Sequence, residues 1–420
     1  MSLLFYSWGE PKYIWLFLGT ITINWLFVLI GTRLKSLKSR KLIGAITIAL
    51  NLLILFWFKY AGWIGGFWNL NIGSIVLPIG ISFYTFQAIS YVADVLLMNK
   101  YNAEKNPVNV GLYIAFFPQL IAGPIIRYED MQYQIRNRRM SIDAFESGCF
   151  RFVFGFCKKV LLADSMAVIV NKAWSNVTEL TSLFAWLGAI AYTLQIFLDF
   201  SAYSDMAIGL GGMFGFTIPE NFNNPYKAKS IRDFWRRWHI TLSIWFRDYV
   251  YIPLGGNKIS EKRTIVNMAI VWLLTGFWHG ANWTFVIWGI AYGILVITEK
   301  LLKIDDKNAG SYKWIGLLYR LFTLLMIVLL WVVFRSDNIG DAMSYIGKMF
   351  NFSADGLSQT ILYISEFRWA IVISIILCFF SMDKIKEKRT WLWPLMIVLF
   401  VVSISYLVKG TFSPFLYFDF

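Results

Sequence analysis

Only two histidines occur among the 420 residues of this chain, and an imidazole ring can act as a general base near neutral pH. His279 lies in Trp278-His-Gly-Ala281, inside a long apolar run, and His239 follows Trp235-Arg-Arg-Trp238. A charge at membrane depth costs roughly 2.5–3.5 kcal/mol. A neutral imidazole avoids that cost and keeps the lone pair that accepts a proton. We therefore take His279 as the first candidate for chemistry.

The segment around His239, residues 232–249, is predicted to form one helix with two faces. Aromatic and apolar residues recur at three- and four-residue spacing, which is typical of a helix lying at the membrane interface. Arginines on the other face could receive a phosphate-bearing donor, because a guanidinium binds phosphate through two parallel N–H groups. Snorkelling arginines that touch anionic lipid would give the same pattern. The faces hold Trp235, Trp238, Leu242, Trp245 and Tyr249 on one side, and Arg232, Arg236, His239, Ser243 and Arg247 on the other.

Two carboxylates precede that segment in a largely apolar stretch, Asp199 and Asp205. At membrane depth a carboxylate is costly without a partner. Each could pair with an arginine of residues 232–249, or orient a histidine through its second ring nitrogen. A buried ion pair that only holds helices together is the structural alternative. Glycines at 209, 211, 212 and 215 follow no predicted strand, so we interpret them as sites of close helix packing.

The composition is that of an integral membrane protein. Apolar residues make up 58% of the chain and charged residues 15%, with 20 tryptophans, and the mean hydropathy is +0.57. Three cysteines and two distant histidines offer no disulfide framework and no zinc-ligand spacing, so no metal is expected. The net charge of +14 falls in short clusters that anchor cytoplasmic loops, and nucleic-acid binding is not needed to explain it.

Hydropathy predicts a multi-pass path through a cell membrane. A spanning helix needs about 20 apolar residues. Because basic loops face the cytoplasm, the charge pattern places both the N-terminus and the C-terminal tail outside. The candidate spans are residues 13–31, 42–58, 75–98, 149–170, 183–200, 265–298, 314–334, 369–382 and 391–409.

Two apolar segments do not fit a single pass. Residues 107–126 have basic flanks at both ends and contain Pro118 and Pro124, which predicts a re-entrant segment; a surface helix is the alternative. Residues 265–298 would form a helix of about 51 Å, longer than a membrane core of about 30 Å. Gly276, Gly280 and Asn282 offer a break that would place His279 at a helix end. A tilted helix that continues into the cytosol is the alternative.

Seven sequence motifs together resemble the membrane-bound O-acyltransferase (MBOAT) family, in the bacterial branch of the alginate O-acetyltransferase and teichoic-acid D-alanylation proteins. The resemblance runs from about residue 75 to 290. The motifs are Leu-Pro-Ile-Gly-Ile-Ser-Phe (77–83), Phe-Pro-Gln-Leu-Ile-Ala-Gly-Pro (117–124), Tyr-Ser-Asp-Met-Ala-Ile-Gly (203–209), Pro-Glu-Asn-Phe-Asn (219–223), Asp-Phe-Trp-Arg-Arg-Trp-His (233–239), Arg-Asp-Tyr-Val-Tyr-Ile-Pro-Leu-Gly-Gly-Asn (247–257) and Trp-His-Gly-Ala (278–281).

The resemblance implies an all-α polytopic fold: a ring of about ten to twelve tilted helices, with re-entrant and interfacial helices, around a thin centre that contains a tunnel. The whole chain, 1–420, would be one membrane domain with its signature-bearing core at 75–290, a helical part at 291–420 and an aromatic tail at 410–420. By motif, His279 matches the catalytic histidine and His239 the second functional position. Further candidates for donor or substrate binding are Arg236, Arg237, Trp238, Asn221, Asp205, Asp199 and Trp278.

Members of this family pass an acyl group from a thioester to a hydroxyl group. The resemblance therefore implies an acyltransferase that takes a small group, acetyl or D-alanyl, from coenzyme A or an acyl carrier protein, without a bound cofactor. It also implies O-acylation of an extracytoplasmic polysaccharide, with an SGNH-hydrolase-like or other transferase as partner. We expect the tail to insert into the outer funnel. A transporter or acyl conduit with proton-relay histidines, and an inactive scaffold, are the alternatives.

Overall fold

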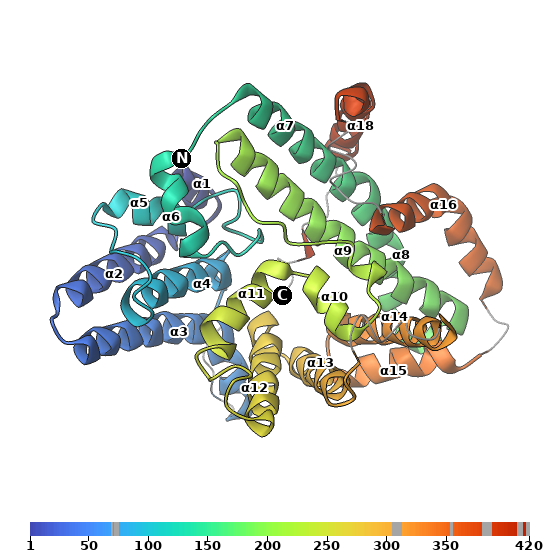
Figure 1. Cartoon of the computed structure of the whole chain (residues 1–420). Coiled ribbons are helices and arrows are strands. Elements are labelled where there is room, and N and C mark those ends of the chain that lie inside the picture. The colour runs from blue at the N-terminus through green and yellow to red at the C-terminus, as the bar shows by residue number, and fades with distance from the viewer. Residues whose placement is uncertain are drawn as a thin grey trace.

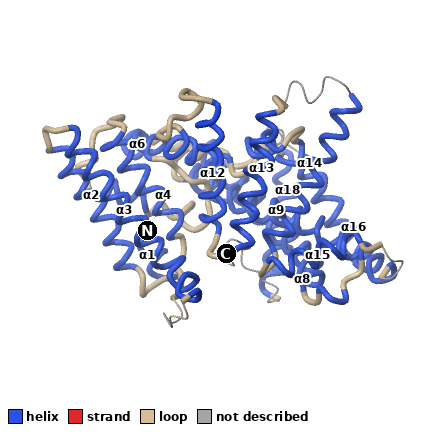
Figure 2. Tube along the Cα trace, turned by 90° about the horizontal axis from the view of Figure 1, so that it is seen from below, coloured by secondary structure: helices blue, strands red, loops and turns tan. Residues whose placement is uncertain are grey.

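The computed structural model describes residues 1–68, 70, 75–304, 313–352, 356–379, 389–409 and 415–416. Within these residues the structure is helical and contains no strand (Figure 2). The longer helices surround a central region that holds two short helices, α10 (Ile231–Arg237) and α11 (Ile240–Phe246) (Figure 1). Most of the basic stretch at 384–389 and of the tail at 410–420 lies outside the described residues. The expected all-helical polytopic fold is confirmed.

Seven described helices are by themselves long and apolar enough to cross a membrane. They overlap the expected spans at 13–31, 42–58, 183–200, 265–298, 314–334, 369–382 and 391–409. The expected span at 75–98 is shorter, because α4 (Ile81–Val92) continues only into one π-helical turn. The seven are α2 (Ile14–Arg33), α3 (Leu37–Phe67), α9 (Ser182–Met213), α13 (Trp283–Leu301), α14 (Lys313–Arg335), α16 (Leu357–Phe379) and α18 (Arg389–Val408).

Polar side chains fasten apolar helices to one another. Asn24 of α2 and Asn51 of α3 exchange two amide hydrogen bonds, of 3.0 and 2.9 Å, in the apolar middle of both helices. Interhelical amide bonds of this kind hold helices together where lipid removes the hydrophobic driving force. The remaining helices are α1 (Ser2–Gly9), α5 (Pro107–Ile114), α6 (Tyr128–Asn137), α7 (Ile142–Cys157), α8 (Asp164–Trp174), α12 (Glu261–His279) and α15 (Ile339–Phe350).

Close packing between α7 and α9 explains the glycines that follow Tyr203. A Cβ atom on Gly209 would lie 2.6 Å from the carbonyl oxygen of Gly148, so only glycine allows these two backbones to approach. A Cβ on Gly148 would in turn lie 2.6 Å from the oxygen of Gly209. The packing interpretation is confirmed for Gly209, whereas Gly215 lies beyond the end of α9 in a left-handed conformation (φ 76°).

The two interruptions expected in the apolar segments are both present. After α5, residues 115–127 form irregular, largely buried backbone, which is tolerated at membrane depth only under a protein cover. One of its amides, that of Ile125, donates to the hydroxyl of Thr241 at 2.9 Å. Further along, α12 ends at His279, Gly280 is extended, and α13 begins after the cap residue Asn282. A continuous helix through His279 is therefore ruled out.

The prediction of one helix over residues 232–249 is wrong. The helix α10 ends at Arg237, His239 takes a left-handed conformation (φ 43°), and α11 starts at Ile240. No glycine or proline marks this break. It is held by a loop, because the backbone N–H of Ile240 donates to the carbonyl of Asn221 at 2.9 Å. The aromatic face is buried in the protein rather than at the interface: Trp235, Trp238, Leu242 and Trp245 are all buried.

Candidate active site

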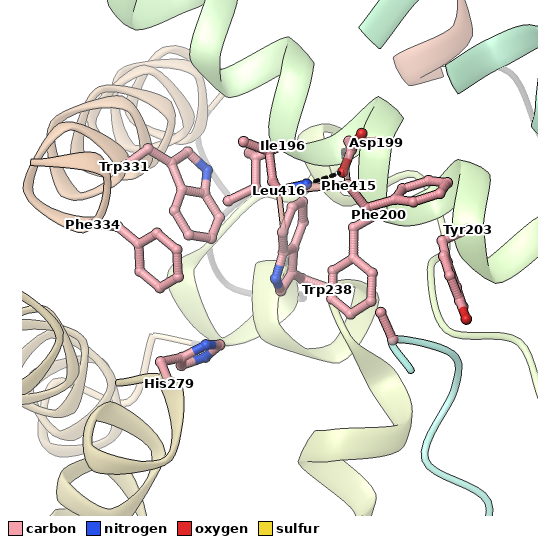
Figure 3. Close-up of a pocket in the computed structure, with 11 residues that line it drawn as sticks. Ile196, Asp199, Phe200, Tyr203, Trp238, His279, Trp331, Phe334, Phe415 and Leu416 are labelled. Carbon is pink, nitrogen blue, oxygen red and sulfur yellow. Dashed lines mark hydrogen bonds between the residues drawn. The ribbon is translucent and has the colours of Figure 1, made fainter. Parts of the chain in front are cut away.

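His279 is the last residue of α12, and its ring faces a central cavity (Figure 3). Edge-on aromatic contacts fix the ring, with centroid distances of 5.0 Å to Trp288 and 5.1 Å to Phe334. Among the described residues, neither ring nitrogen of His279 has a hydrogen-bond partner. The imidazole is therefore held by aromatic packing alone, and its nitrogens are left for a substrate.

The cavity beside His279 is narrow and mostly apolar. Its volume of about 30 Å³ is enough for one or two water molecules. Asp199 is the one acidic residue in its lining. Figure 3 shows side chains converging on it from α9, from the break between α10 and α11, from α14 and from the tail. The lining comprises Ala122, Ile196, Asp199, Phe200, Tyr203, Trp238, His279, Trp331, Phe334, Phe415 and Leu416.

His239 is held by hydrogen bonds that select its tautomer. The side-chain oxygen of Asn221 accepts from the backbone N–H of Thr241 at 3.3 Å and lies 3.0 Å from Nδ1 of His239. Because that oxygen can only accept, Nδ1 of His239 must carry the proton. The lone pair of the neutral ring is then on Nε2, which is buried and has no bonding partner in the described part of the chain. Asn221 thus presents His239 as a hydrogen-bond acceptor or base.

Trp278 lies between the two histidines. Its ring centroid is 6.0 Å from that of His239 and 5.0 Å from that of His279. Phe200 lies near both histidines. Its ring stands edge-on to that of His239, with centroids 4.7 Å apart, and it lines the cavity at His279. The structure therefore brings together six residues that the sequence singled out: His239, His279, Asn221, Asp199, Trp238 and Trp278.

A second, larger cavity of about 430 Å³ runs between α10, α11 and α12. Three arginines line it, together with aromatic and aliphatic side chains and Thr275, which lies one helical turn before His279. Four of the five residues predicted for the polar face, Arg232, Arg236, Ser243 and Arg247, therefore line this cavity. His239, the fifth, does not line it. The polar and aromatic lining of the cavity includes Arg232, Arg236, Arg247, Ser243, Trp235, Trp272 and Phe246.

Arg237 and Asp205 lie away from both cavities. The guanidinium of Arg237 pairs with Asp233 (2.7 Å) in α10 and donates to the carbonyl of Asn223 at 3.4 Å, so it braces a loop. Asp205 is buried and pairs with Arg151 (2.9 Å) and Lys158 (2.5 Å). The structural interpretation of Asp205 fits this geometry. A partnership of Asp205 with a histidine or with the arginines of residues 232–249 does not.

Asp199 connects the core to the C-terminal tail. Its carboxylate pairs with Lys159 (2.7 Å) and accepts the backbone N–H of Leu416 at 2.9 Å (Figure 3). The neighbouring Phe415 stands edge-on to Tyr203, with centroids 5.0 Å apart, and Lys159 lies 4.9 Å from the centroid of its ring. The described part of the tail, Phe415 and Leu416, therefore lies in the cavity beside His279.

Sequence reasoning missed several side chains around His279. Trp331 and Phe334 of α14 were assigned only to a span, because aromatic residues are frequent throughout this chain. Lys59 and Tyr60 of α3 donate to the carbonyls of Trp278 and Phe277. Lys59 carries a sequence signal, since it is a charged residue at the end of a long apolar run, but the predicted span ends at residue 58 and leaves it out.

Comparison with known proteins identifies the family of this chain. The profile of the membrane-bound O-acyltransferase family matches residues 4–304. The chain is 37% identical to a probable alginate O-acetylase of Pseudomonas putida over all of this chain and 93% of that protein. It is 34% identical to a peptidoglycan O-acetyltransferase of Helicobacter pylori, over 87% of this chain and 75% of that protein.

A more distant similarity points to the same chemistry. The teichoic acid D-alanyltransferase of Bacillus subtilis is 29% identical over 58% of this chain and 63% of its own length. Each of these relatives is named for transfer of an acyl group. With a family match over more than half of its length and its two histidines around one tryptophan, the chain belongs to the membrane-bound O-acyltransferase family and is an acyltransferase.

Proposed function

We propose that this acyltransferase moves an acetyl group from a cytoplasmic thioester to a hydroxyl group on an extracytoplasmic polysaccharide, either directly or through a partner protein. The observation that carries the proposal is the place of His279: it lines the cavity that holds the tail, at the end of a helix whose Thr275, one turn earlier, lines the arginine-lined cavity. Acetyl is favoured over D-alanyl because the relatives at 37% and 34% identity are named for O-acetyl transfer.

In the proposed reaction His279 is the general base. Its neutral ring takes the proton of the attacking hydroxyl while the oxygen of that hydroxyl bonds to the thioester carbonyl carbon. The carbon–sulfur bond then breaks, and the thiolate leaves with the proton returned by the imidazolium. General-base assistance of this kind contributes roughly 10²–10⁴-fold. The narrow cavity supports the step, because it limits how many water molecules can compete with the hydroxyl.

His239 would position the donor. With Nδ1–H held by Asn221, the lone pair on Nε2 can accept an N–H from the amides of a pantetheine arm. Arg232, Arg236 and Arg247 would hold the phosphates that such an arm carries, whether the donor is coenzyme A or an acyl carrier protein. The apolar part of the same cavity suits the methylene groups of the arm. The enzyme would need no resident cofactor.

The proposed membrane topology places the acceptor polysaccharide on the outer side of the membrane. Basic loops would lie in the cytoplasm of a cell membrane, with the N-terminus and the tail outside. A partner of the SGNH-hydrolase type on the outer side would complete transfer to the polymer. The tail residues Phe415 and Leu416 support an outer approach to that cavity, because both line it.

The test is acetyl-CoA consumption by the purified protein. Release of free coenzyme A is followed for the native protein and for His279→Gln, each checked for a monodisperse peak and an unchanged melting temperature. We expect the variant to lose roughly 10²–10⁴-fold in rate. A conduit or a scaffold would not consume thioester in a His279-dependent way, so equal rates in the two proteins would refute the proposal.

A further inference from the structure

The helix that carries His279 ends without a continuing turn. Gly280 follows α12 in an extended conformation (φ −176°, ψ 162°). The last four carbonyl groups of any helix have no partner within that helix. Here those carbonyls belong to residues 276–279, which are largely buried, and a buried carbonyl without a partner is costly. The position of His279 therefore depends on what those carbonyls bind.

Two adjacent side chains of α3 bind two of these carbonyls. The ammonium of Lys59 donates to the carbonyl oxygen of Trp278, and the hydroxyl of Tyr60 donates to that of Phe277. Ring contacts accompany both bonds, since Tyr60 stands edge-on to Phe277 at 6.5 Å and Lys59 lies 5.8 Å from the centroid of the Trp278 ring. A cation at a helix C-terminus is also favoured by the helix dipole.

On its opposite side the end of α12 is closed by α13. A Cβ atom on Gly276 would lie 2.6 Å from the carbonyl oxygen of Phe285, and one on Gly289 would lie 2.7 Å from that of Trp272. The two backbones are in contact, so α12 cannot move toward α13. Movement in the other direction, toward α3, is limited by the hydrogen bonds of Lys59 and Tyr60.

We propose that Lys59 and Tyr60 are positioning residues for the reaction. They hold the last turn of α12 so that His279 stays at the distance and angle that proton transfer needs. Neither side chain lines the cavity at His279 or the arginine-lined cavity, so they act through the backbone of α12. The proposal rests on the proposed role of His279 as the base. It also explains why a lysine occurs within a spanning helix, where an ionisable group is otherwise rare and costly.

The experiment measures kcat and KM for acetyl-CoA in purified Lys59→Met, Lys59→Arg and Tyr60→Phe, with native protein and His279→Gln alongside. Lys41→Met is the matched control, because Lys41 is an exposed lysine of the same helix. Misplacing a catalytic group by about 1 Å can cost about 10²-fold. We expect a loss of that order in kcat for Lys59→Met with KM unchanged, and a smaller loss for Tyr60→Phe.

Lys59→Arg keeps the positive donor and should recover most of the lost kcat, a rescue that simple packing would not give. Lys41→Met should match the native protein. If Lys59→Met and Tyr60→Phe both turn over at the native rate while His279→Gln is inactive, the inference is wrong and the proposed function stands. A fall in kcat that Lys59→Arg does not restore, or that only follows loss of folded protein, also overturns it. If His279→Gln is fully active, both proposals fail together.

Discussion

At the scale of single residues, the two histidines are held in opposite ways. His239 is buried and bonded through Nδ1 to Asn221, which leaves Nε2 as its lone-pair nitrogen. His279 is surrounded by aromatic rings and has no hydrogen-bond partner within the described residues. One imidazole is therefore fixed in a single tautomer, and the other can both take and return a proton. This difference matches a positioning role for His239 and a base role for His279.

Replacement of Asn221 should therefore impair catalysis through His239. Asn221→Ala leaves the Nδ1–H of His239 and the N–H of Thr241 without their acceptor. A buried donor without an acceptor costs about 1–3 kcal/mol, and loss of the preferred tautomer should reduce kcat/KM for acetyl-CoA by about tenfold or more. Ser204→Ala is the control, since it removes only the weaker 3.3 Å bond on the other side of Asn221. Equal activity of native protein and Asn221→Ala would contradict this role.

Asp205 should affect stability rather than chemistry. Asp205→Asn leaves Lys158 with a neutral partner in a buried site, while Arg151 keeps only its ion pair with Glu220. Breaking a buried pair on one side typically costs about 3–5 kcal/mol. We expect a lower melting temperature in detergent and fewer folded molecules, with kcat per folded molecule close to native. A melting temperature equal to that of the native protein, together with loss of kcat, would move Asp205 into the site.

Residue types and motifs in the sequence singled out the two histidines and Asn221, the hydrogen-bond partner of His239, but not what each candidate arginine contacts. His239 and His279 stand out because they are the only histidines and because their motifs match a family. Helical spacing put Arg236, but not Arg237, on the predicted polar face, yet both remained candidates for donor binding. Only the fold shows that Arg236 lines the cavity and that Arg237 pairs with Asp233.

At the scale of elements, two helix breaks build the site. The break between α12 and α13 was predictable, because Gly280 and Asn282 are typical of a helix end and a helix start. The break between α10 and α11 was not. His239 adopts a left-handed conformation because Asn221 binds the residues that follow it. A non-glycine residue there costs about 1–2 kcal/mol, and tertiary bonds offset that cost.

The contact between α12 and α13 should tolerate no added methyl group. Gly276→Ala would press a Cβ atom against the carbonyl oxygen of Phe285, and overpacking typically costs about 1–3 kcal/mol. We expect α12 to shift and kcat to fall by about tenfold or more. The matched control is Gly62→Ala in α3, where a Cβ atom would meet nothing within 4 Å and where alanine favours the helix by about 0.5–1 kcal/mol. Native kcat in Gly276→Ala would show that this contact does not set the position of His279.

The tail should be released when Asp199 loses its charge. Asp199→Asn weakens the bond to the N–H of Leu416, because a charged acceptor binds an N–H more strongly than a neutral one. A cysteine placed at Leu416 in a protein without the native cysteines reports the change. Its reaction with a water-soluble thiol reagent should be faster in Asp199→Asn than with Asp199 intact. Equal reaction rates would mean that the hydrogen bond does not hold the tail.

At the scale of the whole molecule, the fold places a cationic cavity and a tail-lined cavity near one imidazole. Composition and hydropathy predicted the helical membrane class and most of the spans, because apolar runs of about 20 residues have few alternatives in a membrane. They could not predict which helix faces meet at the centre, since nearly every face of these helices is apolar. Trp331 and Phe334 illustrate the limit, because nothing in α14 distinguishes them from its lipid-facing residues.

The positive charge of the arginine-lined cavity should set the KM for acetyl-CoA. Reversing Arg236 to glutamate places a like charge beside the phosphates that the cavity is proposed to hold. We expect KM for acetyl-CoA to rise about tenfold or more, with a weaker dependence of KM on salt than in the native protein. Arg237→Glu is the neighbouring control and should change stability more than KM, because its partner is Asp233. An unchanged KM in Arg236→Glu would remove the donor from this cavity.

The most direct test of the central claim is the ester-linked acetyl content of the surface polysaccharide, measured by mass spectrometry in cells. Cells carry either the native protein or His279→Gln, with the membrane abundance of the two proteins matched by immunoblot. We predict that the acetyl esters disappear in the variant at equal abundance. Acetylation that persists at the native level with His279→Gln would contradict the account, because His279 would then not be the base of the reaction.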